Sequence, residues 1–252
     1  MKKIVLLIGV FSVFFLQSSM AQKELKLKDG TTVLLNPDST WSYKPVYDQE
    51  IKTATGEVYK IGSNGKWIFV PAAPIAGKMT DTRKTKSYKT VKIGTQTWMA
   101  ENLAFKTAKG KTWAFNDDEK NVAKYGYLYD YEAALIACPT GYRLPSEEDW
   151  NKLFDYLGGP QIAGGKMKVK DGWEEANPNT SNWSGFSIVG AGFKHGEGGG
   201  FDNLTTSVAY WSSTPSSDPE KVVGFNFAFH TELAFRNEYK KDMGLSIRCI
   251  KK

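Results

Sequence analysis

Cysteine and histidine are both scarce in this sequence. Among 252 residues there are two cysteines, Cys138 and Cys249, and two histidines, His195 and His230. None of the four falls in an HExxH, CxxC or similar spacing, so the sequence argues against a transition-metal site. GxSxG, GxGxxG and GxxxxGK are also absent, so no local motif marks a hydrolase nucleophile or a phosphate-binding loop. We therefore expect no catalytic residue and no metal ligand, while a triad assembled in space leaves no trace at this level.

Long hydrophobic runs are absent beyond the N-terminus. There two lysines precede an apolar run over residues 4–16, and the small-x-small cleavage site SMA ends at Ala21. The run of about 13 residues is too short for a typical membrane span of roughly 20. The pattern predicts a signal peptide over residues 1–21 and an exported protein without a membrane span, located in the periplasm, on the cell surface or in the medium.

A strong excess of one charge is missing as well. Removing residues 1–21 takes away two lysines and no acidic residue, which lowers the formal net charge from +6 to +4. The lysines are spread along the chain rather than clustered beside aromatic residues, so we expect no nucleic-acid partner. In an exported chain, two cysteines are expected to form a disulfide.

An imperfect internal repeat occupies residues 24–70. In each copy a glycine, Gly30 or Gly56, lies eleven residues before a tryptophan, Trp41 or Trp67. The pairs Asp29-Gly30 and Asn64-Gly65 favour tight turns, and each copy therefore predicts a small antiparallel meander. Its tryptophan is expected either to close a minimal core or to present an aromatic platform to a ligand.

A domain boundary is expected at residues 71–87, where the apolar period gives way to proline, alanine and charge. We therefore divide the chain into a signal peptide (1–21), a β-meander repeat unit (22–70), a linker (71–87) and a main domain (88–252). The abundance of glycine and aromatic residues favours short strands and tight turns over a helical bundle.

Local signals in the main domain predict one hairpin and two helices. In residues 88–103, apolar and polar residues alternate on both sides of a turn at Gly94, which is typical of a β-hairpin. Residues 130–137 are rich in helix formers and stop before Pro139. A second helix is expected after Ser146, with an apolar stripe formed by Trp150, Leu153, Phe154 and Leu157.

Three consecutive acidic residues, Glu147, Glu148 and Asp149, have the composition of paired catalytic carboxylates. In the first turn of a helix, however, such residues complement the helix dipole and the free backbone N–H groups. Ser146 takes the N-cap position and Asp149 the capping-box position. We therefore interpret the acidic residues as the start of a helix rather than as acid/base groups.

Alternation near the C-terminus predicts which side chains face the core. On one strand the core-facing residues are Val223, Phe225, Phe227 and Phe229. On the last strand they are Leu245, Ile247 and Cys249. Ser246 and Arg248 are assigned to the opposite face. A thiol on an apolar face is inert, which favours a structural bridge between Cys249 and Cys138 over a reactive pair.

The strongest ligand-binding candidates are aromatic, amide and guanidinium side chains on predicted long loops: Trp183, Tyr210, Trp211, Arg236 and Asn237. Sugar rings present C–H faces that stack on aromatic rings, and their hydroxyls pair with planar polar groups. These residue types therefore favour a glycan ligand. Packing in the core explains each aromatic residue at least as well, so this alternative stays open.

Six ordered segments carry a resemblance to a known family: YKTVKIGTQTWMAENL, YGYLYDYEAA, CPTGYRLPSEEDW, SGFSIVGAGF, AYWSST and GLSIRCIK. In this order they resemble the Fibrobacter succinogenes major paralogous domain, a family of exported bacterial domains. The resemblance covers about residues 80–252, roughly two thirds of the chain.

The resemblance implies an α+β fold similar to C-type lectin-like domains, in which two helices flank a twisted antiparallel sheet with long loops. In this chain a small all-β meander repeat precedes that domain. C-type lectin-like domains join the first helix to the last strand by a disulfide, and Cys138 and Cys249 match those two positions.

Two activities of related folds lack their residues in this chain. The RLPSEEDW segment is similar to a segment of formylglycine-generating enzymes, which use a further cysteine pair upstream of the C-terminal RC. In this chain the corresponding residues 225–241 contain no cysteine, so that activity is not expected. Calcium-dependent lectins use EPN or QPD together with WND, whereas this chain has NPN at 177–179 and no WND. We therefore expect no cofactor, and calcium is the one ion that the resemblance leaves open.

These features predict an exported, non-enzymatic binding or adhesion protein that recognises a cell-surface or extracellular glycan, or a surface protein. A structural subunit of a bacterial envelope or surface assembly is the alternative, and a lectin-fold enzyme with a spatially assembled site is the third interpretation. A groove formed by Trp183, Trp211 and Arg236 would support the first. A broad apolar patch would support the second, and a pocket that joins a histidine to a carboxylate the third.

Overall fold

The computed structural model describes residues 23–26, 32–35, 41–43, 47–53, 58–62 and 67–252. The chain divides into two compact units, residues 1–51 with 59–68 and residues 52–58 with 69–252. The predicted signal peptide and the predicted turns at Gly30 and Gly65 lie outside the described residues. Within the described ranges, no helix has the length and apolar character needed to cross a membrane.

Each copy of the N-terminal repeat forms one three-stranded sheet, as its turn pattern predicts. The first sheet has the order β1-β2-β3 and consists of the antiparallel strands β1 (Lys23–Lys26), β2 (Thr32–Leu35) and β3 (Trp41–Tyr43). The second has the order β4-β5-β6 and consists of β4 (Tyr47–Lys52), β5 (Val58–Gly62) and β6 (Trp67–Val70). In both sheets a tryptophan opens the last strand.

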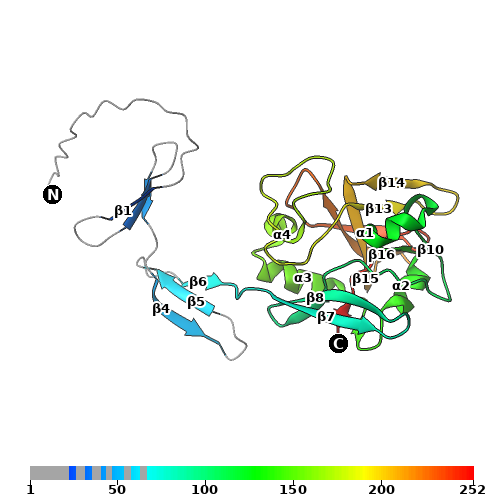
Figure 1. The fold of residues 1–252 in the computed structure, drawn as a ribbon, viewed down its shortest axis with the longest axis horizontal. Coiled ribbons are helices and arrows are strands. Elements are labelled where there is room, and N and C mark those ends of the chain that lie inside the picture. The colour runs from blue at the N-terminus through cyan, green and yellow to red at the C-terminus, as the bar shows by residue number, and fades with distance from the viewer. Residues whose placement is uncertain (1–22, 27–31, 36–40, 44–46, 54–57, 63–66) are drawn as a thin grey trace. The chain divides into compact units, whose positions relative to one another are not determined.

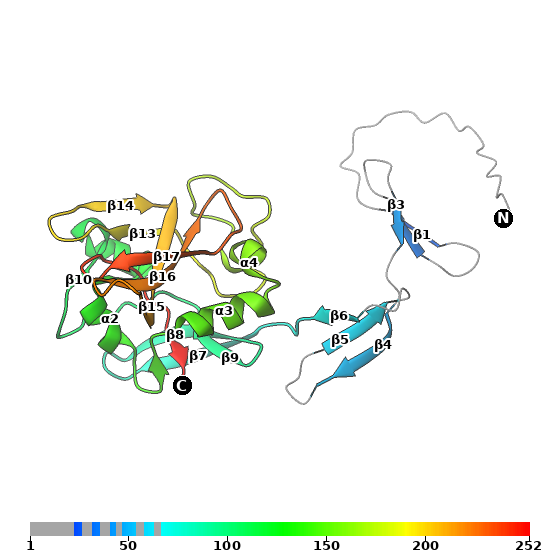
Figure 2. The same cartoon turned by 180° about the vertical axis from the view of Figure 1, so that it is seen from behind.

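Two five-stranded sheets frame the second unit (Figure 1, and from behind in Figure 2). The first, ordered β12-β18-β9-β8-β7, consists of β7 (Ile75–Asp81), β8 (Lys86–Ile93), β9 (Gln96–Met99), β12 (Tyr142–Arg143) and β18 (Ile250–Lys251). The second, ordered β14-β13-β15-β16-β17, consists of β13 (Ala191–Lys194), β14 (Phe201–Leu204), β15 (Ser207–Pro215), β16 (Lys221–Ala228) and β17 (Phe235–Lys240). A short antiparallel ribbon pairs β10 (Thr112–Trp113) with β11 (Leu128–Tyr129).

The predicted linker over residues 71–87 is wrong for most of its length. β7 occupies residues 75–81 and pairs with β8 from Ile75 opposite Lys92 to Asp81 opposite Lys86. Most side chains of β7 are exposed because it is an edge strand. Backbone hydrogen bonds hold such a strand without any apolar alternation, and this explains why the sequence pattern gives no sign of it.

Four helices occur in the described part of the chain: α1 (Val122–Tyr125), α2 (Tyr131–Ala137), α3 (Glu147–Tyr156) and α4 (Pro160–Met167). The two predicted helices correspond to α2 and α3. The Asp130 side chain accepts a hydrogen bond from the Ala133 amide and caps α2, which ends before Cys138. With the two sheets, these helices confirm the α+β class.

The sequence does not predict α4, which follows α3 directly. Pro160 is well placed at its first position, but Gly164 and Gly165 lower its helix propensity. Packing requires the first of these glycines, since a Cβ atom there would lie 2.6 Å from the carbonyl oxygen of Glu232. The residues that allow α4 to pack therefore also weaken its sequence signal.

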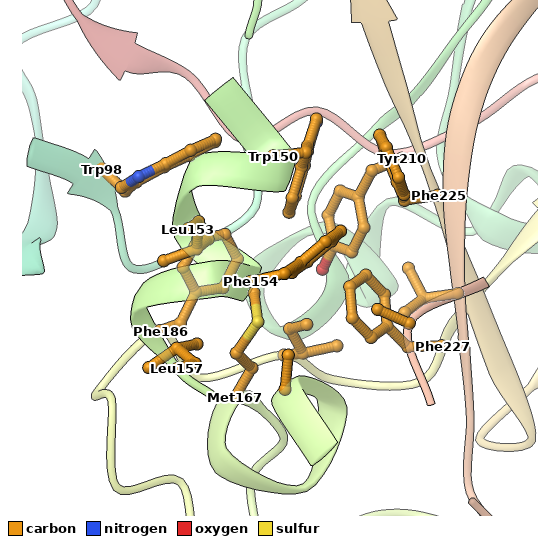
Figure 3. Close-up of a cluster of buried hydrophobic side chains, with 14 of the residues drawn as sticks. Trp98, Trp150, Leu153, Phe154, Leu157, Met167, Phe186, Tyr210, Phe225 and Phe227 are labelled. Atoms are coloured by element: carbon orange, nitrogen blue, oxygen red, sulfur yellow. The ribbon is translucent and has the colours of Figure 1, made fainter. Parts of the chain in front are cut away.

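Trp150 of α3 lies at the centre of the main hydrophobic cluster (Figure 3). Its ring centroid is 4.9 Å from that of Trp98 on β9 and 5.5 Å from that of Phe225 on β16. Further ring contacts come from Phe154, Phe186, Tyr210 and Phe227. Since β9 and β16 belong to different sheets, α3 joins the two sheets through one buried side chain. The predicted core face of β16 is also buried, except for Phe229, which follows the strand and is half-buried.

Candidate functional site

The two cysteines form the predicted disulfide. The Cα atoms of Cys138 and Cys249 are 5.8 Å apart, and the bridge joins residues separated by 111 positions. Cys138 is the C-cap of α2, and Cys249 is buried directly before β18. The bridge therefore fastens a helix end to the C-terminal segment, and no free cysteine occurs in the described residues.

The acidic residues after Ser146 begin α3, as predicted. The Asp149 amide donates to the Ser146 hydroxyl, and the Ser146 amide donates to the Asp149 carboxylate over 2.7 Å, which completes a capping box. Arg143 adds two hydrogen bonds to the same carboxylate. Burial acts to raise the pKa of Asp149, but the hydrogen bonds from Arg143 and Ser146 outweigh it and hold the pKa below its ordinary value of 3.8. This carboxylate serves the helix start rather than a reaction.

Asp149→Asn is expected to lower the free energy of unfolding by about 1 kcal/mol at neutral pH, because it removes the charged partner of Arg143 and Ser146. The folded-state pKa is depressed, so this contribution is complete above the unfolded-state pKa and is lost as the pH falls through the folded-state value. The difference from the parent protein should thus shrink below about pH 4 in urea unfolding.

The matched control for Asp149→Asn is Glu148→Gln. It removes a charge from the same helical turn, where the Glu148 side chain makes no hydrogen bond or ion pair in the described part of the chain. We expect a stability change below about 0.5 kcal/mol for this control. An Asp149→Asn difference that stays constant into acid would contradict the role assigned to the capping carboxylate.

The prediction that Tyr210 and Trp211 bind a ligand is wrong, because both side chains are fully buried. They lie on β15, an inner strand of its sheet, where Tyr210 packs against Trp150 of α3 and Trp211 against Tyr131 of α2. The Trp211 indole donates to the carbonyl oxygen of Tyr129 over 2.7 Å, and the Tyr210 hydroxyl donates to Asn102 over 2.9 Å. Both aromatic residues pack in the core, which is the alternative interpretation that their sequence left open. Trp211 therefore cannot line the predicted groove.

Arg236 and Asn237 are exposed but lie on a strand rather than a loop. Both belong to β17, the edge strand of the second sheet. The Arg236 guanidinium pairs with the carboxylates of Glu147 and Glu238. Asn237 lies next to it with its amide 3.4 Å from the Tyr239 hydroxyl. Arg236 is therefore already engaged by two carboxylates, whereas the Asn237 amide remains open to solvent.

Trp183 is the predicted binding residue whose surroundings suit a ligand. Its side chain is 40% exposed and lies in the long segment between α4 and β13. It borders an open, mainly apolar hollow of about 480 Å³, whose other lining residues are Val70, Pro71, Ala73 and Lys166. Ser181 and Ser184 flank it, and their amides donate to the carbonyl oxygens of Gly165 and Lys166 over 2.8 and 2.9 Å. The backbone on both sides of this indole is thus tied to α4.

The histidines do not form a site with the hollow around Trp183. His195 lies 3.6 Å from the carboxylate of Asp202, and both side chains are exposed. His230 is exposed as well. Across the described ranges, no group of three or more histidine, cysteine or acidic side chains has an arrangement that could hold a metal ion. In the NPN segment, Asn177 uses its side chain on the Asn179 amide and on the carbonyl oxygen of Phe229.

Arg248 is a buried charge, although the alternation of apolar and polar residues assigns it to the face away from the core. Its side chain is 1% exposed. The residues from 244 to 250 are all buried, so both faces of the C-terminal segment are covered and alternation no longer separates core from surface. Burial lowers the pKa of this guanidinium, with Tyr210 and Glu101 acting in the opposite direction. A guanidinium does not lose its proton in proteins, so a positive charge remains inside the domain.

Comparison with known proteins gives one family. A family model described as Fibrobacter succinogenes major domain matches residues 91–251, which is more than half of the chain and includes both cysteines. The resemblance carried by the six ordered segments is thereby confirmed. No curated protein and no solved structure matches the chain.

Proposed function

This chain belongs to the Fibrobacter succinogenes major domain family, and we propose that it acts as an exported, non-enzymatic binding protein for a cell-surface or extracellular glycan. The observation that carries the proposal is the exposed indole of Trp183 at the edge of an open apolar hollow. An exposed aromatic ring beside an apolar hollow offers surface that a ligand can bury, and the C–H face of a sugar ring is a suitable cover.

The anchoring of Trp183 supports a binding role for its hollow. Hydrogen bonds from Ser181 and Ser184 to α4 fix the backbone on both sides of the indole. A ligand that stacks on a fixed ring loses less conformational entropy than one that must first order a loop. Asn237, at a separate exposed position on β17, offers an amide for hydroxyl groups.

The disulfide supports both the location and the finer fold assignment within this proposal. A bridge between Cys138 and Cys249 is stable in the oxidising compartments that an exported protein reaches, whereas the reducing cytosol disfavours it. It connects the end of α2 to the start of β18, the arrangement expected of a C-type lectin-like domain. The predicted signal peptide over residues 1–21 belongs to the same proposal.

A glycan array tests this function. Purified residues 22–252 would be applied to bacterial, plant and host polysaccharides with calcium and, separately, with a chelator. We expect a subset of polysaccharides to bind, with the same pattern in both conditions, because the Trp183 hollow requires no metal ligand. Binding that disappears with the chelator would move the site to a calcium-dependent loop, and silence across the array would contradict a glycan ligand.

A structural subunit of a surface assembly is the second candidate. Leu135 and Ile136 are neighbouring exposed apolar residues on α2, and Ile75 is exposed on the edge strand β7. Large apolar side chains at the surface and an open strand edge are features that subunit contacts cover. A silent array combined with concentration-dependent association of residues 22–252 in sedimentation would favour this candidate.

A further inference from the structure

A buried positive charge that forms no ion pair with a carboxylate among the described residues lies in the domain core. The Arg248 side chain makes its hydrogen bonds only to neutral acceptors: Asn102 Oδ1 at 2.6 Å, Ser187 O at 2.8 Å, Met99 O at 3.3 Å and Phe186 O. Among the described residues, no carboxylate forms an ion pair with it. Buried charges are normally paired, since removing a charge from water is costly.

The hydrogen bonding of Arg248 is also incomplete. A guanidinium has five N–H donors, and the described contacts use four of them, one on Nε, two on Nη1 and one on Nη2. The second N–H of Nη2 has no acceptor in the described part of the chain. Asn102 itself is fully used, because its amide donates to Tyr125 O and to the Ser246 hydroxyl and its oxygen also accepts from the Tyr210 hydroxyl.

Arg248 lines a cavity of about 210 Å³. Its polar and charged lining residues are Arg248, Lys86, Lys89, Lys124, Glu101, Asn102, Ser187 and Tyr88. Four of them are cationic and one is acidic, and a carboxylate oxygen of Glu101 already accepts from the Lys89 amide over 2.7 Å. The cavity is therefore positively charged, with one nearly inaccessible cation in its wall and lysines around it.

We propose that this cavity binds a small oxyanion, either a carboxylate or a phosphate group. The oxyanion would accept a hydrogen bond from the free N–H of Arg248. A charge-assisted hydrogen bond to an oxyanion would supply the missing partner of the buried guanidinium. Lys86, Lys89 and Lys124, which line the same cavity, would attract the anion. The volume is below the range of about 300–1,000 Å³ typical of drug-sized ligands, so the site fits a single small anion or one anionic substituent of a larger molecule.

Nuclear magnetic resonance titration of residues 22–252 tests the anion site. The probes are sodium acetate, sodium glucuronate and inorganic phosphate, each added at constant ionic strength, and the signals are the Arg248 Nε–H group and the amides of Ala100 and Ser187. We expect a saturable shift of these signals with at least one probe. Stronger binding of glucuronate or acetate would assign a carboxylate ligand, and stronger binding of phosphate a phosphoryl ligand.

Lys124→Gln should weaken that binding roughly two- to fivefold, since it removes one exposed charge from the cavity lining. Lys152→Gln is the matched control, because Lys152 lines a different cavity, and it should leave the affinity unchanged. Absence of a saturable shift with all three probes, or equal effects of the two variants, would overturn the proposal. Trp183→Ala should not change anion binding, so this test and the glycan test fail independently.

Discussion

Trp150→Ala is expected to lower the free energy of unfolding by about 3–5 kcal/mol, the range for truncating a large buried aromatic side chain. Trp150 is fully buried and its ring contacts Trp98 and Phe225 in different sheets. Truncation would leave a cavity at the junction of α3 with both sheets. Guanidinium chloride unfolding of residues 22–252, followed by far-ultraviolet circular dichroism, measures the loss.

Trp183→Ala is the matched control for the core variant, because it makes the same chemical change at an exposed position. We expect a change within about 0.5 kcal/mol for the control, as for other surface substitutions. A Trp150→Ala loss no larger than that of the control would contradict the central position assigned to Trp150. It would then be one aromatic residue among many rather than the contact that joins the sheets.

Replacing both cysteines by alanine is the second large perturbation. The double variant Cys138→Ala, Cys249→Ala is expected to lose about 2–5 kcal/mol of unfolding free energy, because the bridge closes a long loop and restricts the unfolded chain. Alanine is preferred over serine here, since a hydroxyl at the buried position of Cys249 would add an unpaired polar group. The same denaturant titration measures this effect.

A thiol count provides the direct check on the disulfide. Denatured, unreduced protein purified from an oxidising compartment should contain no free thiol, and reduction should release two. Single replacement of Cys138 should destabilise the domain about as much as the double replacement, since either breaks the same bridge. Two free thiols before reduction, or an unchanged unfolding midpoint for the double variant, would contradict the account of the C-terminal segment.

The elements that the sequence predicts are those whose signals are local. The start of α3 is contained in Ser146 and the three acids after it, and its buried stripe follows from helical spacing. The hairpin of β8 and β9 follows from alternation around Gly94. Each of these signals lies within a short stretch of sequence, and no distant segment is needed to interpret it.

Sequence-based predictions are wrong where contacts between distant segments determine whether a side chain is buried. Tyr210 and Trp211 have the composition of a binding loop, yet both are buried, because Tyr210 packs against Trp150 of α3 and Trp211 against Tyr131 of α2. Arg248 fits the polar phase of an alternating strand, but consecutive residues on both faces of the segment before β18 are buried. Neither the strand order nor the second covering layer is visible in a single stretch of sequence.

The candidate binding sites also depend on residues from separate segments of the chain. The residue type of Trp183 predicts that it can bind a ligand, whereas the hollow beside it is also lined by Pro71 and Lys166 from other segments. The oxyanion cavity combines Arg248 with Lys124 and Asn102 from separate segments. Residue type therefore suggests which side chains can bind, and only the fold decides which of them share a cavity.

The affinity of Trp183→Ala for the polysaccharide that binds best on the array tests the central claim most directly. The measurement is isothermal titration calorimetry of residues 22–252 and of the variant, with Leu135→Ala on α2 as an exposed apolar control. We predict at least about a tenfold loss of affinity for Trp183→Ala, as for other aromatic anchor residues, and no change for Leu135→Ala. Equal affinities of the parent protein and Trp183→Ala would contradict the assignment of glycan recognition to this hollow.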